Sequence, residues 1–162
     1  MCPIPDSTPG VLVPEFKEIV LIVRGHVKFF RKSPVRNDDV LQSEMISHFN
    51  KFKQLSLNCR TRWTSLKKML KDFLDHWLAI KFACETIGRP FELSNEDIEK
   101  LKELSNILSI FELAVNHLSR RDSNLIEFER VIKFTLKKLQ DIGTPLANIF
   151  IEKTKTRIIV HY

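Results

Sequence analysis

Basic residues are concentrated in one stretch of this sequence that contains no acidic residue. No Asp or Glu occurs from position 45 to position 71, a stretch that we call the basic window. Its seven bases are Lys51, Lys53, Arg60, Arg62, Lys67, Lys68 and Lys71. The chain has 26 Lys and Arg against 20 Asp and Glu, so the 19 bases outside the window are balanced by acids. The net charge of +6 therefore comes from the basic window, which favours contact with a polyanion such as nucleic acid.

A tryptophan follows two arginines at the centre of the basic window. Arg60 and Arg62 are two residues apart, so in an extended connector their side chains point the same way and can contact adjacent phosphates. The indole of Trp63 can stack on an unpaired base, a contact that contributes about 1–3 kcal/mol. The predicted nucleic-acid-binding residues are Arg60, Arg62, Trp63, Lys67, Lys68 and Lys71. The alternative is that the lysines form an ordinary solvated helix face and that Trp63 packs in the core.

Patterns typical of catalysis or metal binding are incomplete in this sequence. The five histidines are scattered, and the pairs Glu44–His48 and His76–Cys84 lack the second pair that a zinc site needs. Cys59 lies beside an arginine, which favours a thiolate, but no known signature links a histidine to it. The sequence has no glycine-rich phosphate loop. We therefore predict no catalytic residue, no metal and no cofactor.

The composition is typical of a soluble, helical, intracellular chain. Apolar residues make up 43% of the 162 positions, which is enough for a core. Few glycines, and few prolines after Pro14, favour long helices over a many-turned β fold. The three cysteines have no CxxC spacing and imply no disulfide framework. The longest purely aliphatic run, residues 19–23, is too short to span a bilayer, and the N-terminus does not resemble a signal peptide, so no membrane partner is expected.

Apolar residues recur at helical spacing along most of the chain and predict an all-α bundle of five or six helices. Residues 1–14 are expected to be a flexible proline-rich lead-in, and residues 15–162 a single helical domain. The predicted helices cover about 15–32, 38–57, 65–87, 94–118 and 124–142, with a sixth element from position 146. Its end, 157–162, is compatible with a strand, a helix or a frayed tail. Capping signals occur at Ser94 with Asp97, at Asn124 and at 143–145.

Each predicted helix has one apolar face for the core. The stripe of helix 65–87 comprises Leu66, Leu70, Phe73, Trp77, Ile80 and Cys84. The three lysines of this helix lie off the stripe, so we expect them to face outward while the same helix packs in the core. Phe52 is expected on the buried face of helix 38–57, and Leu125 on that of helix 124–142. The segment 107–115 is apolar on most sides and is expected to be the most central part of the fold.

Three segments, in order, resemble the hAT superfamily of transposases. Residues 58–65, followed by Met69 and Leu70, resemble the family's "TRW-N-S" signature. Residues 23–36 resemble its lead into that signature, and residues 104–119 resemble its "I-L-x-x-F-x-x-A-T-x-x-L-S" helix. Thr64 replaces the common asparagine, and the usual threonine of the third segment is missing. The similarity covers about residues 18–150.

The resemblance implies a fold and a role in DNA binding. In that family this stretch belongs to a helical insertion that interrupts an RNase H-like catalytic domain. The arginine–tryptophan motif lies near the bound transposon end, where the tryptophan is thought to hold a flipped base, and this role falls on Arg62 and Trp63. The family cuts DNA with two aspartates and a glutamate that hold divalent metal. These lie outside the insertion, and no Asp or Glu here matches them, so the chain resembles an insertion domain truncated at both ends.

The resulting prediction is a nuclear, transposase-like fragment that binds DNA and is not an enzyme by itself. It would act within a larger transposase or as a host-retained derivative. The alternatives are a helical protein–protein interaction module, whose exposed apolar faces bind a partner or self-associate, and a non-functional transposon remnant. The position of Trp63 discriminates between the first two. An indole exposed beside the arginines favours nucleic acid, whereas burial under the helix favours a scaffold.

Overall fold

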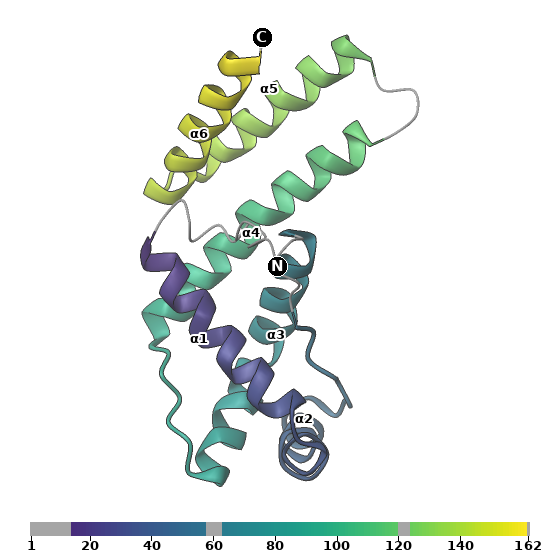
Figure 1. The fold of residues 1–162 in the computed structure, drawn as a ribbon, viewed down its shortest axis with the longest axis vertical. Coiled ribbons are helices and arrows are strands. Elements are labelled where there is room, and N and C mark those ends of the chain that lie inside the picture. The colour runs from purple at the N-terminus through teal and green to yellow at the C-terminus, as the bar shows by residue number, and fades with distance from the viewer. Residues whose placement is uncertain (1–13, 58–62, 120–123, 162) are drawn as a thin grey trace, which may run out of the picture. The chain divides into compact units, whose positions relative to one another are not determined.

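The computed structural model describes residues 14–57, 63–119 and 124–161, and these residues are helical with short connections (Figure 1). Six α-helices and one π-helical turn, η2, account for the regular structure of the described ranges, in which no strand occurs. The all-α prediction is confirmed for these residues. In chain order the elements are α1 Pro14–Arg31, η2 Val35–Leu41, α2 Gln42–Phe49, α3 Trp63–Ile87, α4 Asn95–Leu118, α5 Leu125–Ile142 and α6 Pro145–His161.

The chain forms two compact units. The first contains residues Met1–Lys102, and the second contains Glu103–Tyr162, so the boundary falls within α4. In the first unit, α1, η2 and α2 pack on α3 (Figure 1). In the second, α5 and α6 lie side by side, joined by a tight turn. No helix of the described residues has the length and hydropathy needed to cross a membrane.

The core of the first unit is built from the apolar stripes of α1 and α3. Val23, Val27 and Phe30 of α1 are fully buried, as the periodicity predicts. Five of the six predicted stripe residues of α3 are also buried, namely Leu66, Leu70, Phe73, Ile80 and Cys84. Trp77 differs from the prediction because it is partly exposed and stacks on Phe91, with ring centres 6.5 Å apart. The backbone at His76 is non-helical, with φ −133°, and this kink redirects the helix face at the next residue.

The second predicted helix is shorter than expected. It begins as the η2 turn and ends at Phe49, because Asn50 adopts a left-handed conformation with φ 51° that asparagine tolerates better than most residues. Residues 51–57 are therefore outside the helix, and the prediction that Phe52 is buried is wrong, since its side chain is 67% exposed. α3 begins two residues earlier than predicted, at Trp63.

Side-chain caps set the boundaries of the later helices as predicted. Before α4, the Ser94 hydroxyl accepts from the Asp97 N–H at 3.1 Å, and the Asp97 carboxylate accepts from the Ser94 N–H at 2.9 Å. The bond from the Ser94 N–H to the carboxylate, together with one from the Ser94 hydroxyl to the same carboxylate at 2.8 Å, lowers the pKa of Asp97. The Asn124 side chain caps α5 by accepting from Glu127 N–H at 2.9 Å. Gly143, with φ 67°, ends α5 in the left-handed region where glycine carries no steric penalty.

The second unit leaves more apolar surface exposed than the sequence predicts. Leu113 and Val115 of α4 are 55% and 42% exposed, so the predicted central position of 107–115 is wrong at these residues. Among the described residues of this unit, only α5 and α6 accompany the end of α4, and two helices cannot cover every side of a third. Leu125, expected on the buried face of α5, is 66% exposed. The end of the chain is helical as far as His161, so the strand alternative is wrong.

Candidate functional site

Three lysines share one solvent face at the start of α3. Lys68 and Lys71 are exposed and Lys67 is partly exposed. Residues three and four apart on a helix are neighbours, so Lys71 lies on the same face as both other lysines. The same turns bury Met69 and Leu70 completely. The helix therefore separates its cationic face from its core face, as the sequence predicts, and we call Lys67, Lys68 and Lys71 the lysine face.

The rest of the predicted site lies outside the described part of the structure. Arg60 and Arg62 fall in residues 58–62, which are not described, and so does Cys59. Trp63 is described as the first residue of α3, but its side chain is not. The placement of the two guanidinium groups and the indole beside the lysine face thus stays a prediction.

An acidic residue just beyond the basic window contacts the window in the folded chain. Asp72 is nearly buried, at 7% exposure. Its Oδ1 lies 3.4 Å from Lys53 Nζ, and its Oδ2 accepts from Ser56 N–H at 3.3 Å. Lys53 is therefore partly neutralised and is a weaker candidate for a phosphate contact than a lysine without a carboxylate beside it. The sequence carries one signal for this role, because Asp72 follows the buried Met69 by three residues and so falls on the core side of α3.

Two further helices hold the segment that connects α2 to the undescribed residues. The Gln42 side chain on α2 donates to Lys53 O and accepts from Lys53 N–H, both at 2.9 Å. Arg31 of α1 donates to Leu55 O at 2.7 Å. With Asp72 of α3, these contacts hold residues 53–56 by side chains from three helices. The backbone of residues 53–56 is thus fixed on the first unit just before the undescribed residues.

Four residues of the basic window line an open hollow that the sequence did not predict. It has a volume of about 510 Å³ and is lined by Phe49, Lys51, Phe52, Lys53, Asp75 and His76. We call it the Phe52 hollow. Its inner wall includes Phe49 and His76, whose rings meet edge to face with centres 5.1 Å apart. The available signal was the run Lys51-Phe52-Lys53, an aromatic residue between two lysines.

Cys84 and His26 are both buried in the core of the first unit. No group of three or more His, Cys, Asp or Glu side chains in the described residues could hold a metal ion. Cys84 Sγ lies 3.6 Å from His26 Nδ1 in the core of the first unit. Burial raises the pKa of the Cys84 thiol to about 11, so it is not a thiolate near neutral pH. Burial also lowers the pKa of His26, which favours the neutral ring.

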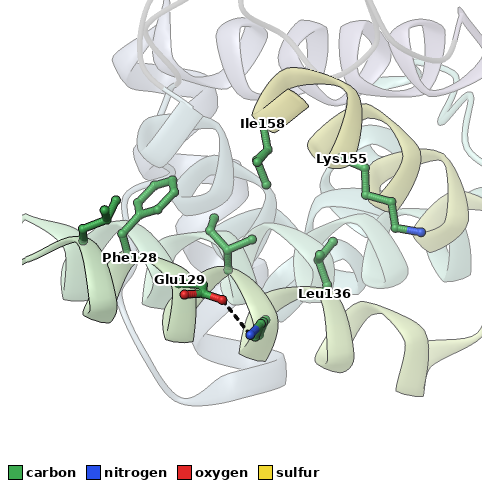
Figure 2. Close-up of a pocket in the computed structure, with 8 residues that line it drawn as sticks. Phe128, Glu129, Leu136, Lys155 and Ile158 are labelled. Atoms are coloured by element: carbon green, nitrogen blue, oxygen red, sulfur yellow. Dashed lines mark ion pairs between the residues drawn. The ribbon is translucent and has the colours of Figure 1, made fainter. Parts of the chain in front are cut away.

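The second unit contains an apolar groove between α5 and α6 (Figure 2). We call it the α5–α6 groove; it has a volume of about 480 Å³ and is lined by Leu125, Phe128, Glu129, Ile132, Lys133, Leu136, Lys155 and Ile158. Figure 2 shows Ile158 pointing from α6 toward α5. Lys133 Nζ lies 2.7 Å from Glu129 Oε1 at the rim, and this contact lowers the pKa of Glu129.

Comparison with known proteins does not identify a family for this chain. No protein-family model, curated protein or solved structure matches it. The resemblance to hAT transposases therefore stays a prediction that depends on the three sequence segments.

Proposed function

We propose that this chain binds DNA through the lysine face of α3 and through the segment of Arg60, Arg62 and Trp63 that leads into it. In this proposal the chain is a nuclear, hAT transposase-like fragment without catalytic residues of its own. The observation that supports it best is the composition of α3. One side of its first turns carries Lys67, Lys68 and Lys71, while the opposite side is core. A rigid helix with cations on one face suits the phosphate backbone, where binding energy comes from counterion release.

Salt dependence tests this proposal directly. We expect the logarithm of the binding constant for hairpin or linear DNA to fall linearly with the logarithm of salt concentration. Replacing Lys67, Lys68 and Lys71 together by alanine should reduce that slope by about three, because each phosphate contact contributes about 0.9. Fluorescence anisotropy of labelled DNA at several salt concentrations gives the slope.

A matched control variant removes three positive charges from the second unit. Lys137, Lys138 and Lys153 are exposed residues of α5 and α6, and their triple alanine variant has the same net charge as the lysine-face variant. We expect this control to keep the slope of the unmodified chain. If DNA affinity is independent of salt, or if the two triple variants lose equal slope, the lysine face is not the DNA contact.

A second candidate function, self-association, is favoured by the α5–α6 groove. Its rim carries charges of both signs, Glu129 on α5 and Lys155 on α6, and each is also ion-paired within its own helix, with Lys133 and Glu152. In a symmetric pair each contact occurs twice, so Glu129 of one copy can meet Lys155 of the other. Two such helix pairs would cover their apolar residues as a four-helix bundle. The occupant that we propose for the groove is therefore a second copy of the chain.

Light scattering coupled to size-exclusion chromatography tests self-association. Leu125→Glu places a charge in the groove at a residue that is 66% exposed, so we expect a dimer to become a monomer without loss of folding. Ile126→Glu is the control, because Ile126 is 63% exposed but does not line the groove. A chain that is monomeric at every concentration tested would contradict the proposal, as would equal effects of the two variants.

A further inference from the structure

In the Phe52 hollow an exposed aromatic ring lies beside a cavity. Phe52 is 67% exposed, and the hollow beside it measures about 510 Å³. An exposed aromatic ring can stack on a flat group that enters the hollow. Phe49 and His76 supply a second aromatic surface on the inner wall. A flat ligand can therefore stack on Phe52 with another aromatic group at its edge.

The hollow is lined by charged side chains of both signs. Lys51 is exposed and forms no ion pair among the described residues, whereas Lys53 is paired with Asp72. Lys51 is thus the cation best placed to meet a phosphate next to the stacked ring. Asp75 supplies the opposite charge, because its exposed carboxylate lines the same hollow. A site with a cation, an aromatic ring and a carboxylate fits a nucleotide better than a plain hydrocarbon or a bare anion.

The carboxylate discriminates among the bases. An ionised Asp75 can only accept hydrogen bonds, through two oxygens. Guanine is the base that offers two adjacent donors on its Watson–Crick edge, the N1–H and the N2 amino group. Adenine and cytosine offer one donor beside an acceptor, which would face the carboxylate unfavourably. The hollow therefore favours guanine, provided that its sugar and phosphate are on the side of Lys51.

We propose that the Phe52 hollow is a binding site for an unpaired guanine nucleotide, with Phe52 stacking on the base, Asp75 accepting from its edge and Lys51 contacting its phosphate. The inference deepens the proposed DNA-binding function and rests on it, because four of the residues that line the hollow belong to the basic window. The same chemistry is offered by a free mononucleotide and by a guanine in a single strand. The test below separates these two sources.

Two titrations of the intact chain test the site. In the first, GMP and CMP are added to ¹⁵N-labelled protein, and we expect GMP to shift amide signals of residues 49–53 and 75–76 more strongly than CMP does. In the second, the chain is titrated with a thymine pentanucleotide that carries one central guanine, and with the all-thymine pentanucleotide. We expect the guanine strand to bind more tightly by on the order of tenfold. Binding of GMP without a preference for the guanine strand would identify a mononucleotide site.

Two substitutions test the roles that we propose for Phe52 and Asp75. Phe52→Ala should weaken guanine binding by on the order of tenfold, as loss of a stacking contact does. Phe134→Ala is its control, since Phe134 is 53% exposed on α5 and lies in the other unit. Asp75→Asn should reduce the preference for guanine over thymine while it leaves stacking intact, because an amide offers a donor in place of one acceptor.

The outcomes separate this inference from the proposed function. Equal shifts with GMP and CMP, or shifts confined to other residues, would overturn the site. If Phe52→Ala and Asp75→Asn leave base preference unchanged while salt-dependent DNA binding persists, the inference fails and the proposed function stands. If the guanine preference is found but the chain does not bind duplex or hairpin DNA, the site stands and the lysine-face proposal fails.

Discussion

Replacing Trp63 by alanine is expected to weaken binding to DNA that carries an unpaired base by about 1–3 kcal/mol, the contribution of one base stacked on an aromatic ring. Binding to continuous duplex should change much less, because a paired base is not available for stacking. Arg62→Ala should lower affinity for both DNA forms and reduce the salt slope by about one. The double variant should then show both losses on hairpin DNA with extruded bases. Fluorescence anisotropy on matched hairpin and linear substrates measures each term.

Two controls determine whether Trp63 acts on DNA or on folding. Trp63→Phe keeps an aromatic ring and should restore most of the stacking contribution. Circular dichroism should show that Trp63→Ala keeps its helical content and its melting temperature. If the alanine variant melts earlier while the folded fraction binds every DNA form normally, Trp63 is a core residue and the DNA-contact role is wrong.

Acidification is expected to destabilise the first unit through His26. The His26 ring is completely buried, and its Nε2 has no hydrogen-bond partner. Burial lowers the pKa of His26 below its ordinary value near 6.5, so the unfolded chain binds a proton at a higher pH than the folded chain does. The stabilisation is fully present above about pH 6.5 and is lost as the pH falls below that value. The free energy of unfolding should fall by up to about 1.4 kcal/mol per pH unit until the folded pKa is reached.

The groups around His26 set the size of this effect. Cys84 of α3 contacts Nδ1, and Phe91 lies against the ring with centres 5.2 Å apart. Arg89, in the connection that follows α3, repels a protonated ring, and Glu92 in the same connection partly opposes that repulsion. Neither Cys84 nor Phe91 can stabilise an imidazolium as a carboxylate would. The buried ring is therefore held neutral chiefly by desolvation.

Urea unfolding at pH values from 5 to 8, followed by tryptophan fluorescence, measures the prediction, because both tryptophans lie in the first unit. His26→Leu should remove most of the pH dependence between 6.5 and 5, since it leaves no titrating ring in the core. His117→Gln, at an exposed position on α4, is the control and should keep the pH dependence of the unmodified chain. A pH dependence that survives in His26→Leu would assign the effect to other groups.

Local sequence patterns predict the helices of this chain well. The first helix, expected over 15–32, is observed as Pro14–Arg31, and its buried residues are apolar side chains at helical spacing together with His26. The capping residues Ser94 and Asn124 act as expected. These features depend on residues within one or two turns of each other, so that the sequence around them contains the necessary information.

The predictions of burial fail where the burial of a side chain depends on elements that are distant in the sequence. Phe52 fits a helical stripe, but the left-handed backbone at Asn50 ends the helix before it. Leu125 fits the apolar face of α5, but α6 covers only part of that face and leaves a groove. Trp77 fits the stripe of α3, but a kink precedes it. In each case the periodicity identifies an apolar face and says nothing about what covers it.

The sequence by itself determined that the described chain is helical and that Lys67, Lys68 and Lys71 lie opposite the core face of α3, because the helical period sets which residues share a face. Tertiary packing decided that Asp72 pairs with Lys53 and that His26 is buried beside Cys84. It also opened the Phe52 hollow. Such contacts join helices that are separate in the chain, and their formation depends on how whole faces pack rather than on the spacing of neighbouring residues.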